Sequence, residues 1–404
     1  MTTKKTTKQQ RATGTQQRRP RIGLALAGGG PLGAIYEIGA LCALEEAIAG
    51  LDCCDCEGYV GISAGGFIAA GLANGLSPRQ LCAAFIDGSA APAERFEPAR
   101  LLQPAWDEFG QRARRLPALL ARAGWDSLVK RRSLLAAAER LGRALPTGLL
   151  SSEALAAQLR RQFEQPGRSD DFRQLKRRLV LVATDLDSGE AVPFGMPGRD
   201  HVPISRAAQA SAALPGLYPP VEIEGRHYVD GALKKTIHAS LLLDEGVDLL
   251  ICLNPLVPYR AEASAPIPSL VDGGLPLVLS QTLRSLIRSR LELGLRGYEN
   301  SHPDTDILLF EPDPGDAEIF MANTFSYSKR RHLAEHAYQA TRAALRERAP
   351  RLREQLGRHG LALREEVLAD ASRRLLSSPA PTRTEAALQR LRADLDRLEA
   401  AYAR

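Results

Sequence analysis

The chain has 404 residues, of which 44% are hydrophobic and 25% are charged. A chain of this length and composition buries the core of one large domain or two, and is neither disordered nor fibrous. The formal net charge is +6, no apolar run approaches the roughly 18 residues of a membrane-spanning helix, and six cysteines are too few for a disulfide framework, so we expect a cytoplasmic protein.

The first 20 residues are predicted to be a disordered basic tail. Residues 1–21 carry seven basic and no acidic residues, and they lack the apolar segment of a secretory signal. We therefore expect the folded part of the chain to begin near residue 21.

An apolar run at residues 22–27 predicts a strand that ends in three consecutive glycines. Gly28, Gly29 and Gly30 have no Cβ, so their main-chain N–H groups can come close to a bound phosphate or to an oxyanion. A dinucleotide site is the alternative. The sequence GGGPLG, which ends at Gly33, has the G-x-G-x-x-G spacing of such a site, but no acidic residue ends a second strand about 20 residues after it, as the ribose of a dinucleotide requires.

A second glycine-rich turn follows a short strand predicted at residues 59–61. Gly61, Ser63 and Gly65 form the G-x-S-x-G pattern of a nucleophile elbow, in which glycines let the chain turn sharply and expose the serine hydroxyl. The next residues, beginning with Ala64, predict a helix whose first N–H groups point at developing negative charge. The N–H groups of Ala64 and of the three earlier glycines are thus candidate oxyanion-hole donors.

Between residues 89 and 178 the strand pattern disappears, and alanine, leucine, arginine and glutamate dominate. This composition predicts a helical insert over the sheet, or a lid. Within it, residues 112–143 carry nine basic and two acidic residues among several leucines. The mixture favours an amphipathic helix on an anionic membrane surface over nucleic-acid binding. An ordinary solvated helix face is the alternative.

Strands are next predicted at residues 179–184 and 221–229, and the second leads into Asp230. A carboxylate between a strand end and a glycine, here Gly231, lies at the edge where open α/β sheets bind their substrates. Asp230 is therefore the candidate base for Ser63. Three histidines, at positions 227, 238 and 302, are alternatives that would make a Ser-His-Asp triad.

Two more predicted strands, at residues 249–253 and 307–310, complete an alternation that indicates an α/β sheet with helices on both faces. We divide the chain into the tail, a catalytic domain at residues 21–312 and a helical C-terminal extension at residues 313–404. Serines and prolines at residues 377–381 predict a break, after which leucines recur at helical spacing.

Two patterns raise the question of a metal. Cys53, Cys54 and Cys56 cluster without the paired C-x-x-C spacing of a structural zinc site. His332, Glu335 and His336 spell H-x-x-E-H, a pattern of some zinc peptidases, but no third ligand stands out. We expect no metal and no other cofactor.

Three motifs in this order, GGGPLG at residues 28–33, GISAGG at 61–66 and DGA at 230–232, resemble the patatin-like phospholipase family. The segments VATDLDSGEAVPFG and SAALPGLYPPV resemble it too, and the resemblance covers residues 21–255. It implies a three-layer α/β/α fold and hydrolysis of lipid acyl esters. It also implies Ser63 as the nucleophile, Asp230 as the base and the N–H groups around Gly29 and Gly30 as oxyanion donors.

One position departs from the family pattern. Relatives commonly have Arg or Lys after the glycines, where this chain has Leu32. The change removes a cationic side chain and keeps the backbone N–H, so another group replaces the cation or the substrate differs. The expected partners are a lipid or acyl-ester substrate and an anionic membrane surface, with the oligomeric state open. A catalytically weak lipid-binding protein on the same fold is the alternative, and a zinc peptidase is a more distant one.

Overall fold

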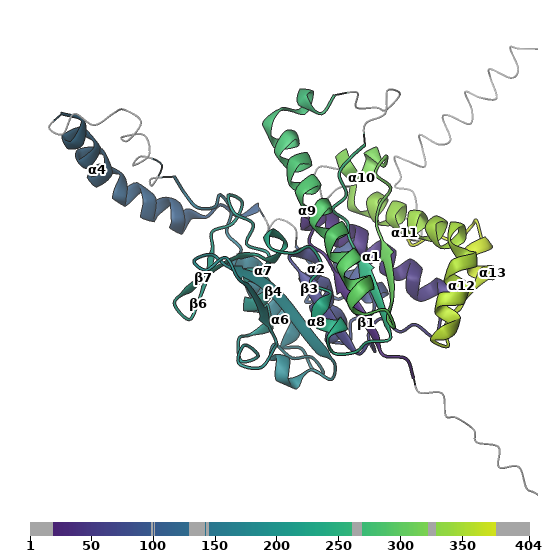
Figure 1. The fold of residues 1–404 in the computed structure, drawn as a ribbon. Helices are drawn as coiled ribbons and strands as arrows, with labels where there is room; N and C mark the ends of the chain where they lie inside the picture. The colour runs from purple at the N-terminus through teal and green to yellow at the C-terminus, as the bar shows by residue number, and fades with distance from the viewer. Residues whose placement is uncertain are drawn as a thin grey trace, which may run out of the picture.

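The computed structural model of the chain describes residues 19–97, 100, 102–128, 142, 145–260, 269–321 and 329–376. In these ranges the chain forms an eight-stranded, mostly parallel sheet between layers of helices, as Figure 1 shows. The predicted α/β/α fold is confirmed. The first 18 residues and the leucine-rich stretch after residue 376 lie outside the described residues, so the expectations for them stay predictions.

The sheet has the strand order β6-β7-β4-β3-β1-β8-β9, with β5 paired to β4. In that order the strands are β6 (Val221–Ile223), β7 (Arg226–Asp230), β4 (Arg178–Asp185), β3 (Gly58–Ile62), β1 (Ile22–Leu26), β8 (Leu249–Leu253) and β9 (Asp306–Phe310), together with β5 (Ala191–Phe194). From β4 to β9 the neighbours are parallel, whereas β5, β6 and β7 pair antiparallel. The parallel strands β1 and β3 therefore end side by side near the middle of the sheet.

Both faces of the sheet are buried, because alternate side chains of each strand point to opposite sides. Leu24 and Leu26 of β1 belong to the core on one face, and Ala25 belongs to the core on the other. The helices packed on the first face include α1 (Gly30–Ala47), α2 (Ala64–Ala73) and α7 (Ile204–Ser211), and those on the second include α8 (Ser240–Leu243) and α9 (Gly274–Ser301). Burial on both sides explains why the strand sequences are apolar throughout.

The segment predicted as a helical insert does not lie over the sheet as one piece. After α3 (Pro78–Cys82) and η1 (Ala83–Asp87), its described elements are α4 (Trp106–Leu128), α6 (Glu153–Phe163) and η3 (Phe172–Gln174). Helix α6 packs against α7, whereas α4 extends away from the body of the molecule in Figure 1. Only α6 has the position expected of a covering element.

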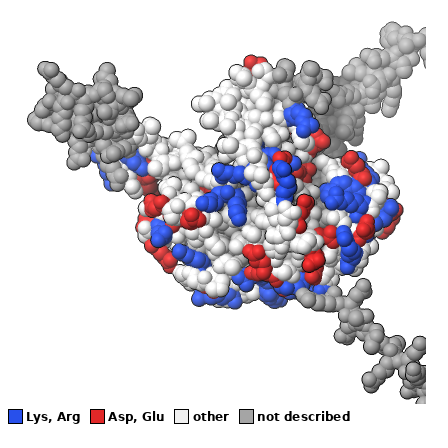
Figure 2. Space-filling model, in the orientation of Figure 1, with Lys and Arg blue, Asp and Glu red and all other residues white. Residues whose placement is uncertain are grey.

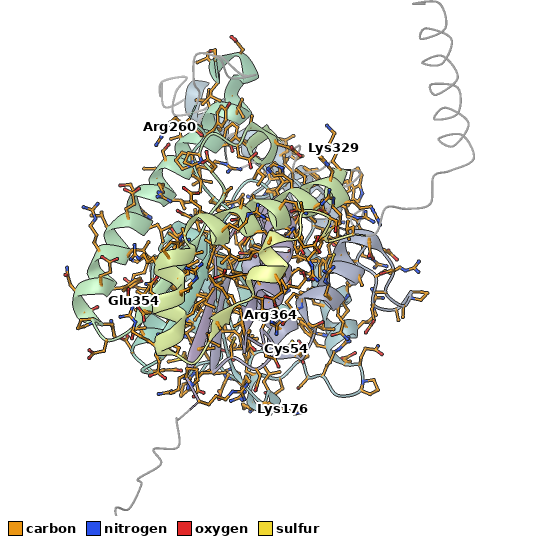
Figure 3. The ribbon with its side chains drawn as sticks, turned by 90° about the vertical axis from the view of Figure 1, so that its right-hand side faces the viewer. Cys54, Lys176, Arg260, Lys329, Glu354 and Arg364 are labelled. Carbon is orange, nitrogen blue, oxygen red and sulfur yellow. The ribbon has the colours of Figure 1, made fainter. Side chains whose placement is uncertain are left out.

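The last described helices pack on the side of α1, the side that faces the viewer in Figure 3. They are α10 (Ala317–Met321), α11 (Arg330–Glu347), α12 (Ala349–Arg358) and α13 (Glu365–Ala369), and the short strands β2 (Ile48–Ala49) and β10 (Ala362–Leu363) pair beside them. Helices α1 and α11 touch so closely that a Cβ on Gly39 would lie 2.5 Å from the Ala334 carbonyl oxygen. Arg364, labelled in Figure 3, donates its backbone N–H to the Ala47 oxygen at 2.8 Å.

The single strand predicted at residues 221–229 is wrong. Strands β6 and β7 form a hairpin there, because Glu224 and Gly225 both have positive φ, at 52° and 75°, and turn the chain back. Strand β5 was not predicted at all. None of the described helices is both long and apolar enough to cross a membrane.

Candidate active site

A cavity of about 260 Å³ lies where β1, β3 and β7 end. The glycine turn after β1, Ser63 after β3 and Asp230 of β7 all line it. Most of the remaining lining is apolar, and helices α1, α6 and α9 contribute about half of it. The structure thus brings the predicted residues of three separate motifs to one hollow, at the edge where open α/β sheets bind ligands.

Ser63 has the backbone geometry of a sharp turn between β3 and α2. Its φ of 52° and ψ of −125° are values that residues with side chains seldom adopt. The Ser63 N–H donates to Ser211 Oγ at 2.9 Å, and Ser211 Oγ donates to the Val182 oxygen at 2.6 Å. Ser211 of α7 therefore ties the strained turn to β4 and holds it in place.

Asp230 is the last residue of β7, and three hydrogen bonds hold it in place. Its N–H donates to the Ala213 oxygen at 3.0 Å, and its carbonyl accepts from Thr184 Oγ1 at 3.1 Å. One carboxylate oxygen accepts the N–H of Ala232 at 2.9 Å, at the start of the short helix η4 (Gly231–Leu233).

The Ser63 hydroxyl lies close enough to the Asp230 carboxyl to lower the pKa of that carboxyl. Both residues are buried, at 8% and 3% exposure. Burial raises the pKa of Asp230 to about 6, and the Ala232 N–H and the Ser63 hydroxyl reduce this rise. A carboxylate with such a pKa is a stronger base than an exposed aspartate and is still ionised at neutral pH.

The glycine turn passes close beside Ser63. A Cβ on Gly28 would lie 3.0 Å from Ser63 Cβ and 3.6 Å from its Oγ, and Gly30 has a φ of 60°. Gly30 and Ala64 are the first residues of α1 and α2, where N–H groups have no acceptor within the helix. The N-termini of two helices, with their positive dipole ends, therefore lie at the cavity that Ser63 lines.

The glycines on either side of Ser63 are needed because the backbone of neighbouring segments passes very close to them. A Cβ on Gly65 would lie 2.4 Å from the Ala27 oxygen, and a Cβ on Gly61 would lie 2.6 Å from the Cα of Gly66. Any side chain at these positions would push α2 away from β1 or from β3. The spacing of the G-x-S-x-G pattern thus follows from how tightly the elbow is packed.

Gly33 and Gly231, from the other two motifs, also lie too close to neighbouring atoms to carry a side chain. A Cβ on Gly33 would touch Pro255, at 3.0 Å, and one on Gly231 would lie 2.1 Å from the Val182 oxygen. Gly33 lets the first turn of α1 approach the segment after β8. Gly231 lets the chain after Asp230 cross β4.

The sequence model of the family described as patatin-like phospholipase matches residues 24–243, which is more than half of the chain. The chain belongs to the patatin-like phospholipase family. The match contains the glycine turn, the elbow and Asp230, and it ends before α9 begins.

Solved structures similar to this patatin-like chain include VipD from Legionella pneumophila, with 16% identity, a TM-score of 0.34 and coverage of 79% of this chain and 67% of that one. The type III effector ExoU, known from Pseudomonas aeruginosa, has 17% identity, a TM-score of 0.33 and coverage of 82% and 53%. Human GIVD cytosolic phospholipase A2 has 15% identity, a TM-score of 0.31 and coverage of 82% and 59%. The chain spans between about half and two thirds of the length of these proteins.

Leu32, the departure from the patatin-like pattern, does not line the cavity. Its side chain is buried beside Tyr36, Ile319 and Leu333, where α1 meets α10 and α11. A cation at this position would be enclosed by apolar side chains. The position is therefore part of the core between α1 and the C-terminal helices.

No histidine is among the described residues that line the cavity. His227 is exposed on β7, and His302 lies near Asp244, 3.3 Å from its carboxylate. His238 is buried, contacts the Gly231 backbone and has its pKa lowered by burial to about 4. The three histidines considered as members of a triad are thus not at the cavity.

The three residues of the H-x-x-E-H pattern have other partners. His332 pairs with Glu318 and His336 with Asp316, at 2.5 and 2.6 Å. Glu335 accepts the backbone N–H groups of residues 375 and 376. Within the described part of the chain, no group of three or more His, Cys, Asp or Glu could hold a metal ion, and the cysteines are free.

Several residues of the cavity carry no signal in the sequence. Arg284 and Ile287 of α9 line it, although α9 starts 44 residues after Asp230 and lies outside the family match. Phe85 and Phe96 stack at 4.8 Å on the opposite part of the lining. Ser211 was not predicted either, and only its place in the SAALPG segment could have suggested a role.

Proposed function

We propose that this patatin-like protein hydrolyses acyl esters of lipids with Ser63 as the nucleophile and Asp230 as its base. One observation carries the proposal. The two residues line the same mostly apolar cavity, beside the N-termini of α1 and α2, and the Ser63 hydroxyl lies close enough to lower the pKa of the Asp230 carboxyl. A serine, a base and oxyanion donors are the groups that acyl transfer through an enzyme ester requires.

In the first step, Ser63 Oγ attacks the carbonyl carbon of the ester and its proton passes to the Asp230 carboxylate. The tetrahedral intermediate then breaks the bond to the alcohol oxygen, which takes the proton from Asp230 and leaves. Water attacks the resulting acyl-serine, again giving its proton to Asp230, and the acid and free Ser63 are released. No metal takes part in these steps.

The negative oxygen of the intermediate needs donors, and the N–H groups of Gly29, Gly30 and Ala64 supply them in this proposal. Each such donor is worth on the order of 3 kcal/mol in transition-state stabilisation. This contribution matters more here than in a Ser-His-Asp enzyme, since Asp230 is a weaker base than imidazole.

We also propose that the protein binds a membrane surface with α9. This helix has exposed leucines along one side while its opposite side lines the cavity, and the exposed residues are Leu275, Leu279, Leu286 and Leu293. In Figure 2 the lobe formed by the first half of α9 is largely free of charged side chains. An exposed apolar ridge of this kind fits insertion into a lipid interface.

The test is hydrolysis of a panel of lipid esters by the wild type and by Ser63→Ala and Asp230→Asn. We expect turnover only in the wild type, with kcat/KM falling as the pH drops below about 6, because protonated Asp230 cannot accept the serine proton. Both variants should still bind vesicles. Vesicle binding without turnover by the wild type would favour the lipid-binding alternative, and full activity of Ser63→Ala would remove the serine mechanism.

A further inference from the structure

One basic side chain, that of Arg284, is among the described residues that line the active-site cavity. Arg284 lies on the inner face of α9 next to Leu283 and Ile287, and it is only partly accessible to solvent. The rest of the lining is largely apolar. A guanidinium in such a place is drawn partly out of water, which lowers the pKa of Arg284 and disfavours its charge.

The contacts of Arg284 leave its charge without a counter-ion. Nη1 donates to the Val257 oxygen at 3.1 Å, and the guanidinium carbon lies 5.1 Å from the centre of the Phe320 ring. Within the described part of the chain, no carboxylate forms an ion pair with it. Arg288, one turn later on α9, instead pairs with both Glu292 and Glu311.

Arg284 has further N–H groups besides the one that donates to Val257. A guanidinium has five N–H groups in a planar fork that matches the oxygens of a phosphate or carboxylate. Phe320 holds the flat side of the group, as expected for a cation over an aromatic ring. The edge of the fork is thus held in a fixed orientation by Val257 and Phe320, and donors remain for a ligand.

A hydroxyl lies one turn away on the same lining face. Ser280 precedes Arg284 by four residues, which places the two side chains next to each other on the helix. On the same helix Thr282 and Ser285 donate to the carbonyls four residues before them, whereas no such bond is found for Ser280 within the described contacts. Ser280 and Arg284 are therefore two neighbouring donors at the cavity.

We propose that Arg284, with Ser280 beside it, binds the phosphate of a lipid headgroup while the ester lies at Ser63. Arg284 is then the residue by which this enzyme distinguishes phosphorylated glycerolipids from neutral glycerides. It supplies from α9 the positive charge that Leu32 cannot provide, because Leu32 is packed against the C-terminal helices. This proposal rests on the proposed function, and it adds a residue outside the matched region of the family.

The experiment compares two substrates with the same acyl chains in detergent micelles, dioleoyl phosphatidylglycerol and dioleoylglycerol. For Arg284→Met we expect kcat/KM to fall roughly 10- to 100-fold on the phospholipid, the loss that fits one hydrogen-bonded ion pair, and to stay unchanged on the glyceride. Arg284→Lys should retain part of the activity. The control is Arg296→Met, because Arg296 is exposed on α9 and lies away from the cavity. It should leave both activities unchanged.

A binding arm keeps this proposal separate from the proposed catalysis. In the Ser63→Ala background, 1-O-hexadecyl-glycerophosphocholine should bind about tenfold more weakly when Arg284 is Met, and 1-O-hexadecylglycerol should bind equally well. If no ester is turned over but this difference holds, the catalytic proposal fails and the phosphate site stands. Equal losses on both lipids, or no loss on either, would overturn the phosphate site. Inhibition of glyceride hydrolysis by millimolar inorganic phosphate that depends on Arg284 would instead indicate a site for free phosphate.

Discussion

Burial of Asp230 disfavours the charged carboxylate that a base for Ser63 requires. Its carboxylate is enclosed, and the energy of keeping it charged is met only in part by the Ala232 N–H and the Ser63 hydroxyl. Such a cost is common at active sites, where a group is held in a state that suits the reaction and lowers stability.

This conflict predicts how the stability of Asp230→Asn depends on pH. The pKa of Asp230 is about 6 when folded and near 3.8 when unfolded, so the folded state of the wild type binds more protons between these values. The contribution of Asp230 to the free energy of unfolding is therefore fully present below about pH 4. It falls by about 3 kcal/mol as the pH rises through 6. Asparagine does not titrate, so the free energy of unfolding of Asp230→Asn lacks this decrease with pH. Relative to the wild type, Asp230→Asn should therefore gain stability from pH 5 to pH 8.

Urea unfolding at pH 5, 6.5 and 8 measures this difference, with the exposed Asp272→Asn as the control. A difference between Asp230→Asn and the wild type that stays constant with pH would contradict the assigned environment of Asp230.

At the residue scale, the sequence pointed to two residues that do meet at one cavity, Ser63 and Asp230, and said little about the rest of its lining. Ser63 and Asp230 stand in patterns that local backbone geometry demands, so they could be found by spacing alone. Arg284 and Ser211 could not, because each reaches the site through tertiary packing of a helix that has no motif of its own. The departure at Leu32 was noticed, but only the structure reveals that this side chain faces α10 and α11.

The approach of α2 to β1 is the element-scale feature on which the elbow depends. Gly65 and Gly66 are adjacent in the first turn of α2, and only Gly65 faces the backbone of β1. A Cβ at Gly65 would lie 2.4 Å from the Ala27 oxygen, whereas one at Gly66 would meet nothing closer than Leu181 Cδ2, at 3.5 Å.

We therefore expect Gly65→Ala to be destabilised by about 1–3 kcal/mol or more, because α2 must move away from β1. Gly66→Ala should be as stable as the wild type or more so, since alanine favours the helix. Urea unfolding of both variants checks this, and activity should follow the same order. Equal stability of the two alanine variants would show that the packing described for Gly65 is wrong.

The strands and helices were predictable to different degrees at this scale. Continuous apolar runs indicated β1, β4, β8 and β9, because strands buried on both faces are apolar throughout. The hairpin of β6 and β7 was missed, since the signal for its turn is only the Glu-Gly pair at 224–225. The path of α4 away from the sheet could not be predicted, because helical periodicity does not say what a helix packs on.

The whole molecule carries its positive charge unevenly. Residues 112–143 contribute nine basic and two acidic residues to a chain whose net charge is only +6. In Figure 1, α4, which contains the first part of this segment, extends to the left of the body, and α9 rises at the top of the picture. A basic segment and exposed apolar side chains in one protein are together the features that favour binding to anionic lipid surfaces.

Vesicle binding should therefore depend on the charge of the segment and on salt. We expect the triple variant Lys130→Gln, Arg131→Gln, Arg132→Gln to bind phosphatidylglycerol vesicles about tenfold more weakly at 0.05 M salt, and the difference to shrink at 0.5 M, where charges are screened. A control variant with three glutamines at Arg351, Arg353 and Arg374, near α12 and α13, should bind like the wild type. Cosedimentation measures both. Binding that does not respond to salt would make the segment an ordinary solvated helix.

The central claim is that Ser63 is activated by Asp230 at this cavity. Reaction with a lipid-like fluorophosphonate, followed by mass spectrometry of the digested protein, tests it most directly. The account predicts one adduct on the peptide containing Ser63, slower formation in Asp230→Asn and none in Ser63→Ala. An adduct on another serine, or undiminished labelling of Ser63→Ala, would contradict it.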